Sequence, residues 1–241
     1  MNFLDVSVLF LKSLLLNLRR LVLLLVSKSF IIPLMEPEEI LLITHIIRKT
    51  KPMKCLEWGV GGSTLYFPSK LEKKSKWISI EHNKSWSELI QKLIENDQRN
   101  EVHYVLPNSY PWTDSFSDGS DTDLQDYIEF PSRFGKFDLI FIDGRARVPC
   151  LKKALTLLNP NGAVILHDAG REHYHLGFDG YKHSLLFTGS IPGMGIWIGT
   201  NDENLLDKIN SRTHEFNWLM NKKLRDSMVY QLLTHQLFSP F

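Results

Sequence analysis

Two apolar runs of the sequence each end in a group of titratable side chains. Asp143 and Arg145 follow the run at 137–142, and His167 and Asp168 follow the run at 162–166. An imidazole titrates near neutral pH and a neighbouring carboxylate can hold its tautomer, so His167 and Asp168 are candidates for a general base and its orienting partner. Asp143 and Arg145 could orient a substrate. We therefore expect all four residues to be catalytic.

A glycine turn follows a third apolar run, in the segment CLEWGVGGST at residues 55–64. Gly59 and Gly61 let the backbone turn sharply and approach a ligand closely. Glu57 lies near the end of this run, and Glu81 ends the next run 22 positions after Gly59. That distance is typical of a nucleotide-binding fold, in which an acid at the end of the second strand accepts hydrogen bonds from ribose hydroxyls.

Position 64 is Thr64, where a dinucleotide fingerprint has a third glycine, so the sequence argues against an NAD-dependent or nucleotide-sugar enzyme. The segment instead resembles motif I of the class I S-adenosylmethionine-dependent methyltransferases, over roughly residues 37–200. By this resemblance, Asn108 after the third strand contacts the adenine. The resemblance implies S-adenosylmethionine as cofactor and a binding site formed by Glu57, Gly59, Gly61, Gly62, Ser63, Glu81, His82 and Asn108.

Two subfamilies resemble the chain at the groups after the fourth and fifth strands. The cation-dependent O-methyltransferases bind a metal with acids that match Asp143 and Asp168, but Ala169 replaces their asparagine, so a divalent metal is an alternative and not our expectation. The glucuronoxylan 4-O-methyltransferases are similar at Asp143-Gly144 and His167-Asp168. This resemblance implies a small-molecule or glycan hydroxyl as acceptor, in particular a uronic acid. The planar donors of Arg145, Arg147 and Arg171 suit a carboxylate or phosphate on that acceptor.

The elements that position these residues alternate between strand and helix. This alternation predicts an α/β fold, a Rossmann-like three-layer sandwich. Only six residues join the last two strands, too few for a parallel crossover, so the seven-stranded, mainly parallel sheet should have an antiparallel last strand. Strands are predicted at 54–58, 77–80, 102–106, 137–142, 162–166, 184–188 and 195–200, and helices at 37–51, 63–71, 85–96 and 149–158.

An insertion at residues 107–135 separates the third and fourth strands. It carries six acidic residues before its first cation, Arg133. It predicts either a solvated acidic loop or a lid over the ligand.

The first 35 residues form a leucine-rich appendage to a methyltransferase domain at 36–241. Lys12, Arg19, Arg20 and Lys28 interrupt the apolar runs, which are too short to span a bilayer. Residues 3–22 have one apolar and one basic side, so this helix packs on the domain or on a second subunit, or lies on a membrane surface.

Composition limits the function further. With 28 basic and 27 acidic residues the net charge is +1, so nucleic acid is not an expected partner. The two cysteines, Cys55 and Cys150, lie in or beside apolar segments, and we expect a reduced, cytoplasmic protein. Peripheral membrane contact and a homo-oligomer stay open. The main rival to an enzyme is a noncatalytic binding or membrane-associated module with the same fold.

Overall fold

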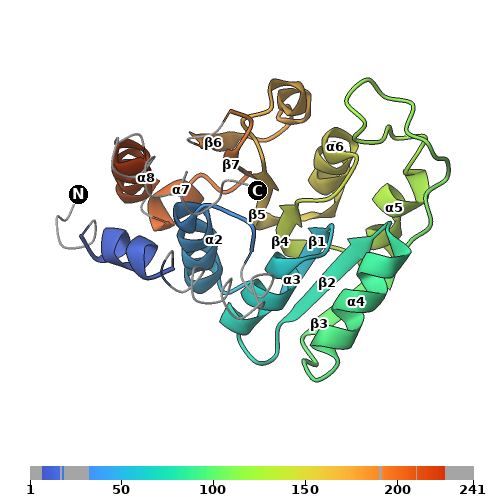
Figure 1. Ribbon diagram of the computed structural model, residues 1–241, viewed down its shortest axis with the longest axis horizontal. Helices are drawn as coiled ribbons and strands as arrows, with labels where there is room; N and C mark the ends of the chain where they lie inside the picture. The colour runs from blue at the N-terminus through green and yellow to red at the C-terminus, as the bar shows by residue number, and fades with distance from the viewer. Residues whose placement is uncertain (1–6, 17, 19–32, 190–191, 210, 226–241) are drawn as a thin grey trace, which may run out of the picture.

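A seven-stranded sheet forms the centre of the computed structural model, which describes residues 7–16, 18, 33–189, 192–209 and 211–225 (Figure 1). The order of the strands in the sheet is β3-β2-β1-β4-β5-β7-β6. The order reverses between β1 and β4, which are neighbours at the centre. The strands are β1 (Lys54–Trp58), β2 (Lys76–Glu81), β3 (Asn100–Tyr104), β4 (Phe137–Ile142), β5 (Leu158–His167), β6 (His183–Thr188) and β7 (Gly195–Thr200).

The pairing of the strands confirms the predicted fold class. β1 pairs in parallel with β2 and β4, and β4 pairs in parallel with β5. β7 runs antiparallel to both of its neighbours, β5 and β6. The sheet is therefore mainly parallel with a reversed β7, and its strands β1 to β5 present their carboxyl ends at one edge.

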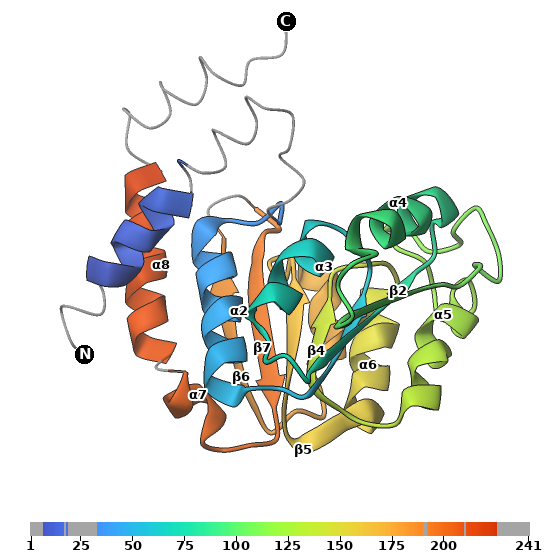
Figure 2. The ribbon, with the colours of Figure 1, turned by 90° about the horizontal axis from the view of Figure 1, so that it is seen from below.

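Helices cover both faces of the sheet (Figure 2). One apolar core joins α2, α7 and α8 to side chains such as Phe141 and Ile198. The other joins α5, α6 and the 3-10 helix η4 to side chains such as Ile140 and Trp197. The helices are α2 (Pro37–Thr50), α3 (Gly62–Tyr66), η2 (Phe67–Lys70), α4 (Lys84–Ile94), α5 (Gln125–Glu129), η3 (Phe130–Phe134), α6 (Arg147–Leu157), η4 (Glu172–Gly177), α7 (Leu205–Lys208) and α8 (Ser211–Arg225).

Several predicted elements differ from the observed ones, and β5 begins at Leu158 where the strand was predicted from 162. The helix predicted at 63–71 divides into α3 and η2 because Pro68 cannot donate the backbone hydrogen bond that continues an α-helix. β3 begins at Asn100 and is largely polar, as an edge strand can be. The insertion is not a simple solvated loop, because α5 and η3 lie within it and Asp118 and Asp123 are buried.

The N-terminal helix is described at residues 7–16 and packs beside α2 and α8 (Figures 1 and 2). Ser13 is buried there and donates a hydrogen bond to the carbonyl of Leu9, whereas Leu11 and Leu15 are more than half exposed. Residues 3–6, 17 and 19–22 of the predicted amphipathic segment, among them Arg19 and Arg20, lie outside the described residues. The predicted boundary between this appendage and a domain at 36–241 stays a prediction. No described helix is long and apolar enough to cross a membrane.

Candidate cofactor and acceptor site

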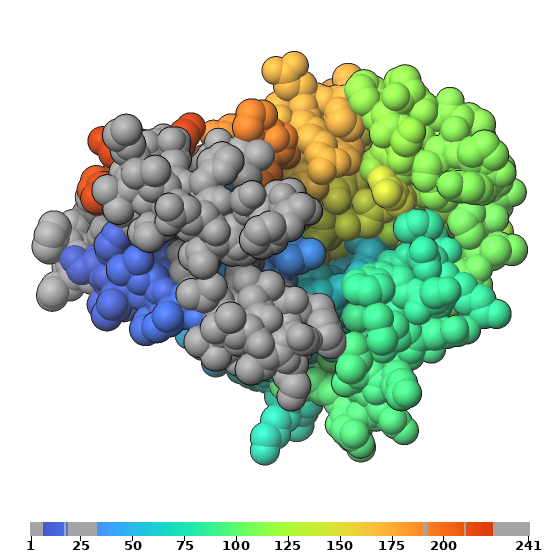
Figure 3. All heavy atoms as spheres, in the orientation of Figure 1, coloured from blue at the N-terminus to red at the C-terminus, as the bar shows by residue number. Residues whose placement is uncertain are grey.

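Two adjoining cavities open at the carboxyl edge of the sheet, where the strand order reverses. In an open parallel sheet this is the place where ligands bind. The larger cavity has a volume of about 400 Å³ and the smaller about 190 Å³. Figure 3 looks onto this edge and shows a hollow between the segments before and after the insertion. Both cavities are lined by Gly59, Val60, Trp86 and Asp143.

Glu57 holds the glycine turn in place through hydrogen bonds from residues of the turn and of β2, and it lines neither cavity. Its side chain is fully buried and accepts four hydrogen bonds, at 2.5 to 2.8 Å, from neutral donors. The donors are the hydroxyls of Ser63, Thr64 and Ser79 and the indole nitrogen of Trp77. Burial disfavours the charged carboxylate and raises the pKa of Glu57 to about 7, although these hydrogen bonds oppose the shift.

Thr64 explains how the turn manages without a third glycine. Its hydroxyl donates to Glu57 and accepts a hydrogen bond from the backbone N–H of Gly61, at 3.0 Å. A threonine here therefore ties the turn to the buried acid. The spacing of the glycines did not reveal this role.

The two glycines that motivated the prediction do different things. Gly59 has φ +92°, and a Cβ there would come within 2.7 Å of the backbone of Gly144 on the neighbouring loop. Its lack of a side chain is a requirement of the fold. Gly61 has extended backbone, and a Cβ there would meet nothing within 4 Å, because it would project into open space. Gly61 and its neighbours Gly62 and Ser63 line the smaller cavity.

Glu81 lies at the end of β2 and lines the larger cavity, as the sequence placed it. Its carboxylate is already held by backbone N–H groups: Oε2 accepts from Val60 at 3.0 Å, and Oε1 accepts from His82 and Asn83 at 2.8 and 2.7 Å. A carboxylate has about four acceptor positions, so one position on Oε2 is open to a ligand hydroxyl. Glu81 thus both shapes the turn and faces the cavity.

Arg147 joins the groups that follow β4 and β5 into one charged cluster. Its guanidinium is buried and uses all five N–H donors. It bonds the carboxylates of Asp143 and Asp168, both at 3.1 Å, and the carbonyl oxygens of Gly144, His167 and Asp143. Arg147 was expected to bind an acceptor, whereas the structure uses it to hold two carboxylates together.

His167 is enclosed between carboxylates. Nδ1 is 2.8 Å from Oδ1 of Asp143, and Nε2 is 3.3 Å from Oε2 of the buried Glu39 at the start of α2. Burial lowers the pKa of His167, but Asp143 and Glu39 more than reverse that effect and raise it to about 10. For Asp143 the signs are reversed: burial alone would raise its pKa, but the nearby charges of His167, Arg147 and Arg171 outweigh burial and lower the pKa below its usual value. The geometry thus favours an imidazolium paired with an ionised carboxylate.

The residues of this cluster do not fit a divalent metal. Asp143, His167 and Asp168 could each offer a ligand atom, and these atoms lie within 4.8 Å of one another. However, the guanidinium of Arg147 bridges the two carboxylates, the guanidinium of Arg171 reaches Asp168 at 2.8 Å, and the imidazolium adds a third positive charge. A doubly charged ion would have to displace these cations.

Of the other expected site residues, some line a cavity and Asn108 does not. His82 and Arg145 line the larger cavity, together with Arg171. Asn108 lines neither cavity, because its side chain accepts a hydrogen bond from the N–H of Asp126 at the start of α5. Its contact with adenine stays a prediction without support from this geometry.

Trp86 is one of the cavity residues that the sequence did not predict. It lines both cavities, and its indole nitrogen donates to the carbonyl of Val60 at 2.5 Å. Asn83 positions it by accepting a hydrogen bond from its backbone N–H at the start of α4. An Asn three residues before a Trp, directly after a strand, was the available signal for a capped helix beside the turn.

The insertion reaches the charged cluster through Asp118. Oδ2 of Asp118 accepts from the backbone N–H of Arg147 at 3.0 Å, and Oδ1 accepts from the hydroxyl of Tyr174 at 3.2 Å. Asp123 holds the insertion together by accepting hydrogen bonds from Ser109, Thr113 and Ser120. Two acids of the predicted solvated loop are therefore structural.

Several solved structures with a similar fold are methyltransferases. An O-methyltransferase from Bacillus cereus in complex with SAH has a TM-score of 0.54 and 15% identity, over 83% of this chain and 92% of that one. A methyltransferase from Geobacter sulfurreducens has a TM-score of 0.51 and 14% identity, over 72% and 81% of the two chains. The O-methyltransferase TomG from Streptomyces achromogenes, involved in tomaymycin synthesis and in complex with SAM, has a TM-score of 0.50 and 17% identity, over 70% and 82%.

At these identities the likeness shows the fold, which is the Rossmann-like fold of the methyltransferases. No protein-family model matches the sequence, and no curated protein does either. The activity therefore has to be argued from the site itself.

Proposed function

We propose that the chain binds S-adenosylmethionine beside the glycine turn and transfers its methyl group to a hydroxyl oxygen. The observation that carries this proposal is the combination of an extended, unobstructed Gly61 with the carboxylate of Glu81 at the switch point of the sheet. The sheet with its reversed β7 is that of solved O-methyltransferases, one of them in complex with SAH.

The reaction is an in-line displacement. The acceptor oxygen would form a bond to the methyl carbon, the bond from carbon to sulfur would break with its electron pair left on sulfur, and the hydroxyl proton would pass to the carboxylate of Asp143. The cofactor is activated by its own sulfonium charge, so the protein has to align the acceptor and accept a proton. The position of Asp143 in the lining of both cavities supports a role for it in this work.

Asp143 acts as a hydrogen-bond acceptor for the hydroxyl, with His167 and Arg147 as positioning residues. The low pKa of Asp143 makes it a weak base toward a neutral hydroxyl. The hydroxyl becomes strongly acidic as its oxygen gains positive charge from the incoming methyl group, so a weak base is sufficient late in the reaction. His167, held as an imidazolium, orients Asp143 and does not itself take the proton.

The acceptor class that fits is a small molecule or glycan with an acidic group. Arg145 and Arg171 line the larger cavity, and the side chains of both are close to half exposed. Arginine binds carboxylates and phosphates with paired donors. A uronic acid is the first acceptor to test.

Calorimetry with SAH, and with NAD as the competing ligand, tests the proposal. The parent should bind SAH and not NAD. Gly61→Leu should place a side chain in the smaller cavity and abolish SAH binding without shifting the urea midpoint of unfolding, because Gly61 has extended backbone. If Gly61→Leu binds SAH like the parent, the cofactor does not lie beside the turn.

Transfer of a labelled methyl group separates an enzyme from a binding module. Uronic-acid glycans and simple phenols are offered as acceptors, with Asp143→Asn as the variant. We expect SAH binding to survive in Asp143→Asn and transfer to fall about 100-fold or more, as is typical for loss of an acid–base group. Binding of SAH without transfer to any acceptor would favour the noncatalytic module.

A further inference from the structure

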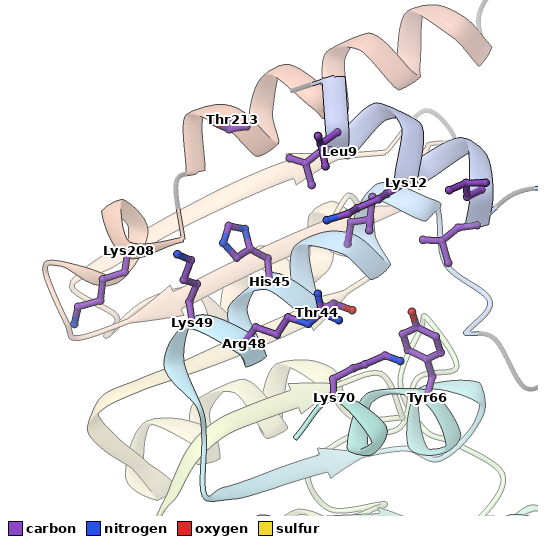
Figure 4. Close-up of a pocket in the computed structure, with 14 residues that line it drawn as sticks. Leu9, Lys12, Thr44, His45, Arg48, Lys49, Tyr66, Lys70, Lys208 and Thr213 are labelled. Atoms are coloured by element: carbon purple, nitrogen blue, oxygen red, sulfur yellow. The ribbon is translucent and has the colours of Figure 1, made fainter. Parts of the chain in front are cut away.

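A third cavity, of about 570 Å³, lies away from the candidate active site, between the N-terminal helix, α2 and the start of α8. Figure 4 shows its side chains gathered around this space. The residues of α2 that line it, such as Leu41 and Arg48, are not the ones that α2 packs into the apolar core, such as Ile43 and Ile47. The proposed methyl transfer assigns no role to it.

The charged side chains that line the cavity are all cations within the described part of the chain. Lys12, Arg48 and Lys49 have no ion-pair partner among the described residues. Lys70 and Lys208 line the same space, and Lys208 pairs with Asp202 at 2.8 Å. Three uncompensated positive charges around one cavity attract an anion.

Two buried hydroxyl groups in the wall of the cavity lack hydrogen-bond partners. Thr44 is 8% exposed and Thr213 is 2% exposed, and neither Oγ1 is hydrogen-bonded within the described structure. Buried polar groups normally have a partner, so each such exception needs an explanation. An oxygen-rich ligand held by the cations would supply partners to both.

The other lining of the cavity is apolar and belongs largely to the N-terminal helix. Val8, Leu9, Leu15 and Leu16 line it, with Leu41 of α2 opposite. Further around the same helix, Leu11, Leu14 and Leu18 are 41% to 59% exposed. A small hydrophilic anion gains nothing from this apolar wall, whereas a molecule with an acidic head and an acyl chain uses both parts.

We propose that this cavity binds the phosphate headgroup of an anionic membrane phospholipid. The phosphate lies between Lys12, Arg48 and Lys49, near the hydroxyl of Thr44. The acyl chains run along the apolar side of the N-terminal helix, whose exposed leucines enter the lipid surface. An amphipathic helix binds a surface in this way through buried apolar area and attraction to anionic lipids together. The site does not depend on methyl transfer.

Co-sedimentation of the full chain with vesicles is the first test. Vesicles of phosphatidylcholine alone are compared with vesicles that also contain phosphatidic acid. Arg48→Glu/Lys49→Glu should lower partitioning onto the anionic vesicles by at least about tenfold, since basic residues near such a surface attract anionic lipids and acidic residues repel them. Lys92→Glu/Lys152→Glu is the matched control, because it makes the same charge change on exposed residues of α4 and α6 outside the cavity.

The control should lower partitioning by less than about twofold, because salt screens charges that lie away from the bound lipid. Equal losses in both double variants would show a diffuse charge effect and overturn the proposal of a site. Absence of binding to phosphatidic acid vesicles by the parent would overturn it as well.

A soluble lipid distinguishes a phospholipid site from a site for free phosphate. Dihexanoylphosphatidic acid, below its micelle concentration, and inorganic phosphate are titrated separately by calorimetry. We expect the short-chain lipid to bind at least about tenfold more tightly, because its acyl chains bury apolar area against the helix. Thr44→Val should weaken binding of the short-chain lipid, while the circular dichroism spectrum of the variant matches that of the parent. Equal affinity for both ligands, or no effect of Thr44→Val, would overturn the lipid assignment.

Discussion

Glu57 and Asp143 lie at the carboxyl ends of neighbouring strands, and the protein stabilises them in opposite ways. Glu57 is fully buried and is surrounded by neutral donors, so burial raises its pKa to about 7. Asp143 is partly exposed and has an imidazolium and two guanidinium groups around it, which lower its pKa against the effect of burial. The carboxyl of Glu57 holds the glycine turn in place, and the ionised carboxylate of Asp143 lines both cavities.

The difference teaches which carboxyl is structural. A group that holds a loop does best with neutral hydrogen bonds, because these do not require a charge to be buried. A group that must stay ionised beside a ligand needs cations, and the cations in turn need the fold to hold them. Arg147 is that cation, and the insertion holds it through Asp118.

The largest expected effect is at Arg147. Arg147→Met leaves Asp143 and Asp168 without their bridge and should lower the free energy of unfolding by about 3 to 5 kcal/mol, the cost of breaking a buried ion pair on one side. Urea unfolding measures this. Arg145→Met is the control. Arg145 is exposed, and its ion pair with Asp118 is long, at 3.9 Å, so this variant should change the free energy of unfolding by about 1 kcal/mol at most.

The same variant sharpens the metal question. When Arg171→Met is added to Arg147→Met, both guanidinium groups are gone, and Asp143, His167 and Asp168 should bind Mn²⁺ in exchange for the imidazolium proton. Mn²⁺ should therefore raise the thermal midpoint of this double variant and leave the parent unchanged. A Mn²⁺-dependent midpoint in the parent would show that Arg147 does not replace the ion.

The next effect is the pH dependence that Glu57 causes. Its folded-state pKa of about 7 lies above the usual 4.5, so the folded chain binds more protons between these values. The stability this confers is complete below about pH 4.5 and is lost as the pH rises through 7, a loss on the order of 3 kcal/mol. Glu57→Gln should flatten this part of the stability profile, measured by urea midpoints at pH 5 and 8.

Two further measurements separate Glu57 from other groups. The exposed Glu88→Gln should keep the slope of the parent. The raised pKa of His167 acts in a higher window, where stability falls as the pH rises from about 6.5 to about 10. If Glu57→Gln retains the slope between pH 5 and 7, Glu57 is ionised in the folded chain and the contrast with Asp143 fails.

Gly59→Ala should have an intermediate effect. A side chain at φ +92° is strained and would press on Gly144, so we expect a loss of about 2 kcal/mol or more. Gly61→Ala should leave stability within about 0.5 kcal/mol of the parent, as a surface substitution does. Equal losses of unfolding free energy in the two variants would mean that both glycines are required by the conformation of the turn.

The smallest expected effect is at Arg171. Its pair with Asp168 is 2.8 Å long, but its side chain is 44% exposed, so Arg171→Ala should cost about 1 kcal/mol at most. We expect the Michaelis constant for an acidic acceptor to rise while SAH affinity is unchanged. A stability loss as large as that of Arg147→Met would place Arg171 in the buried part of the cluster.

Long-range placement limited what the sequence could predict. β1, β4 and β7 were predicted to the residue because each is a short, mainly apolar segment followed directly by glycine or a polar residue. β3 was displaced because an edge strand needs few apolar residues. For the site, the sequence placed Glu81, Gly61 and Asp143 at the cavities, since strand ends fix their positions.

The roles of individual charged residues were harder to predict. Arg145, Arg147 and Arg171 lie in similar local sequence, yet one is buried and two are exposed, and only the packing of the insertion decides which. Glu57 and Glu81 look alike in sequence, but only Glu81 lines a cavity. The surroundings of His167 depend on Glu39, which is 128 residues away.

Asp118 makes the insertion exchangeable in part. The tip before it exposes Tyr110 and Phe116, at 77% and 61%, whereas Asp118 itself is bonded to Arg147 and Tyr174. A designer who replaces the exposed side chains of this tip can change that surface and leave the charged cluster in place, provided that Asp118 keeps its bonds to Arg147 and Tyr174. Asp123 must also keep its bonds to Thr113 and Ser120, so two aspartates are the fixed points of an otherwise replaceable segment.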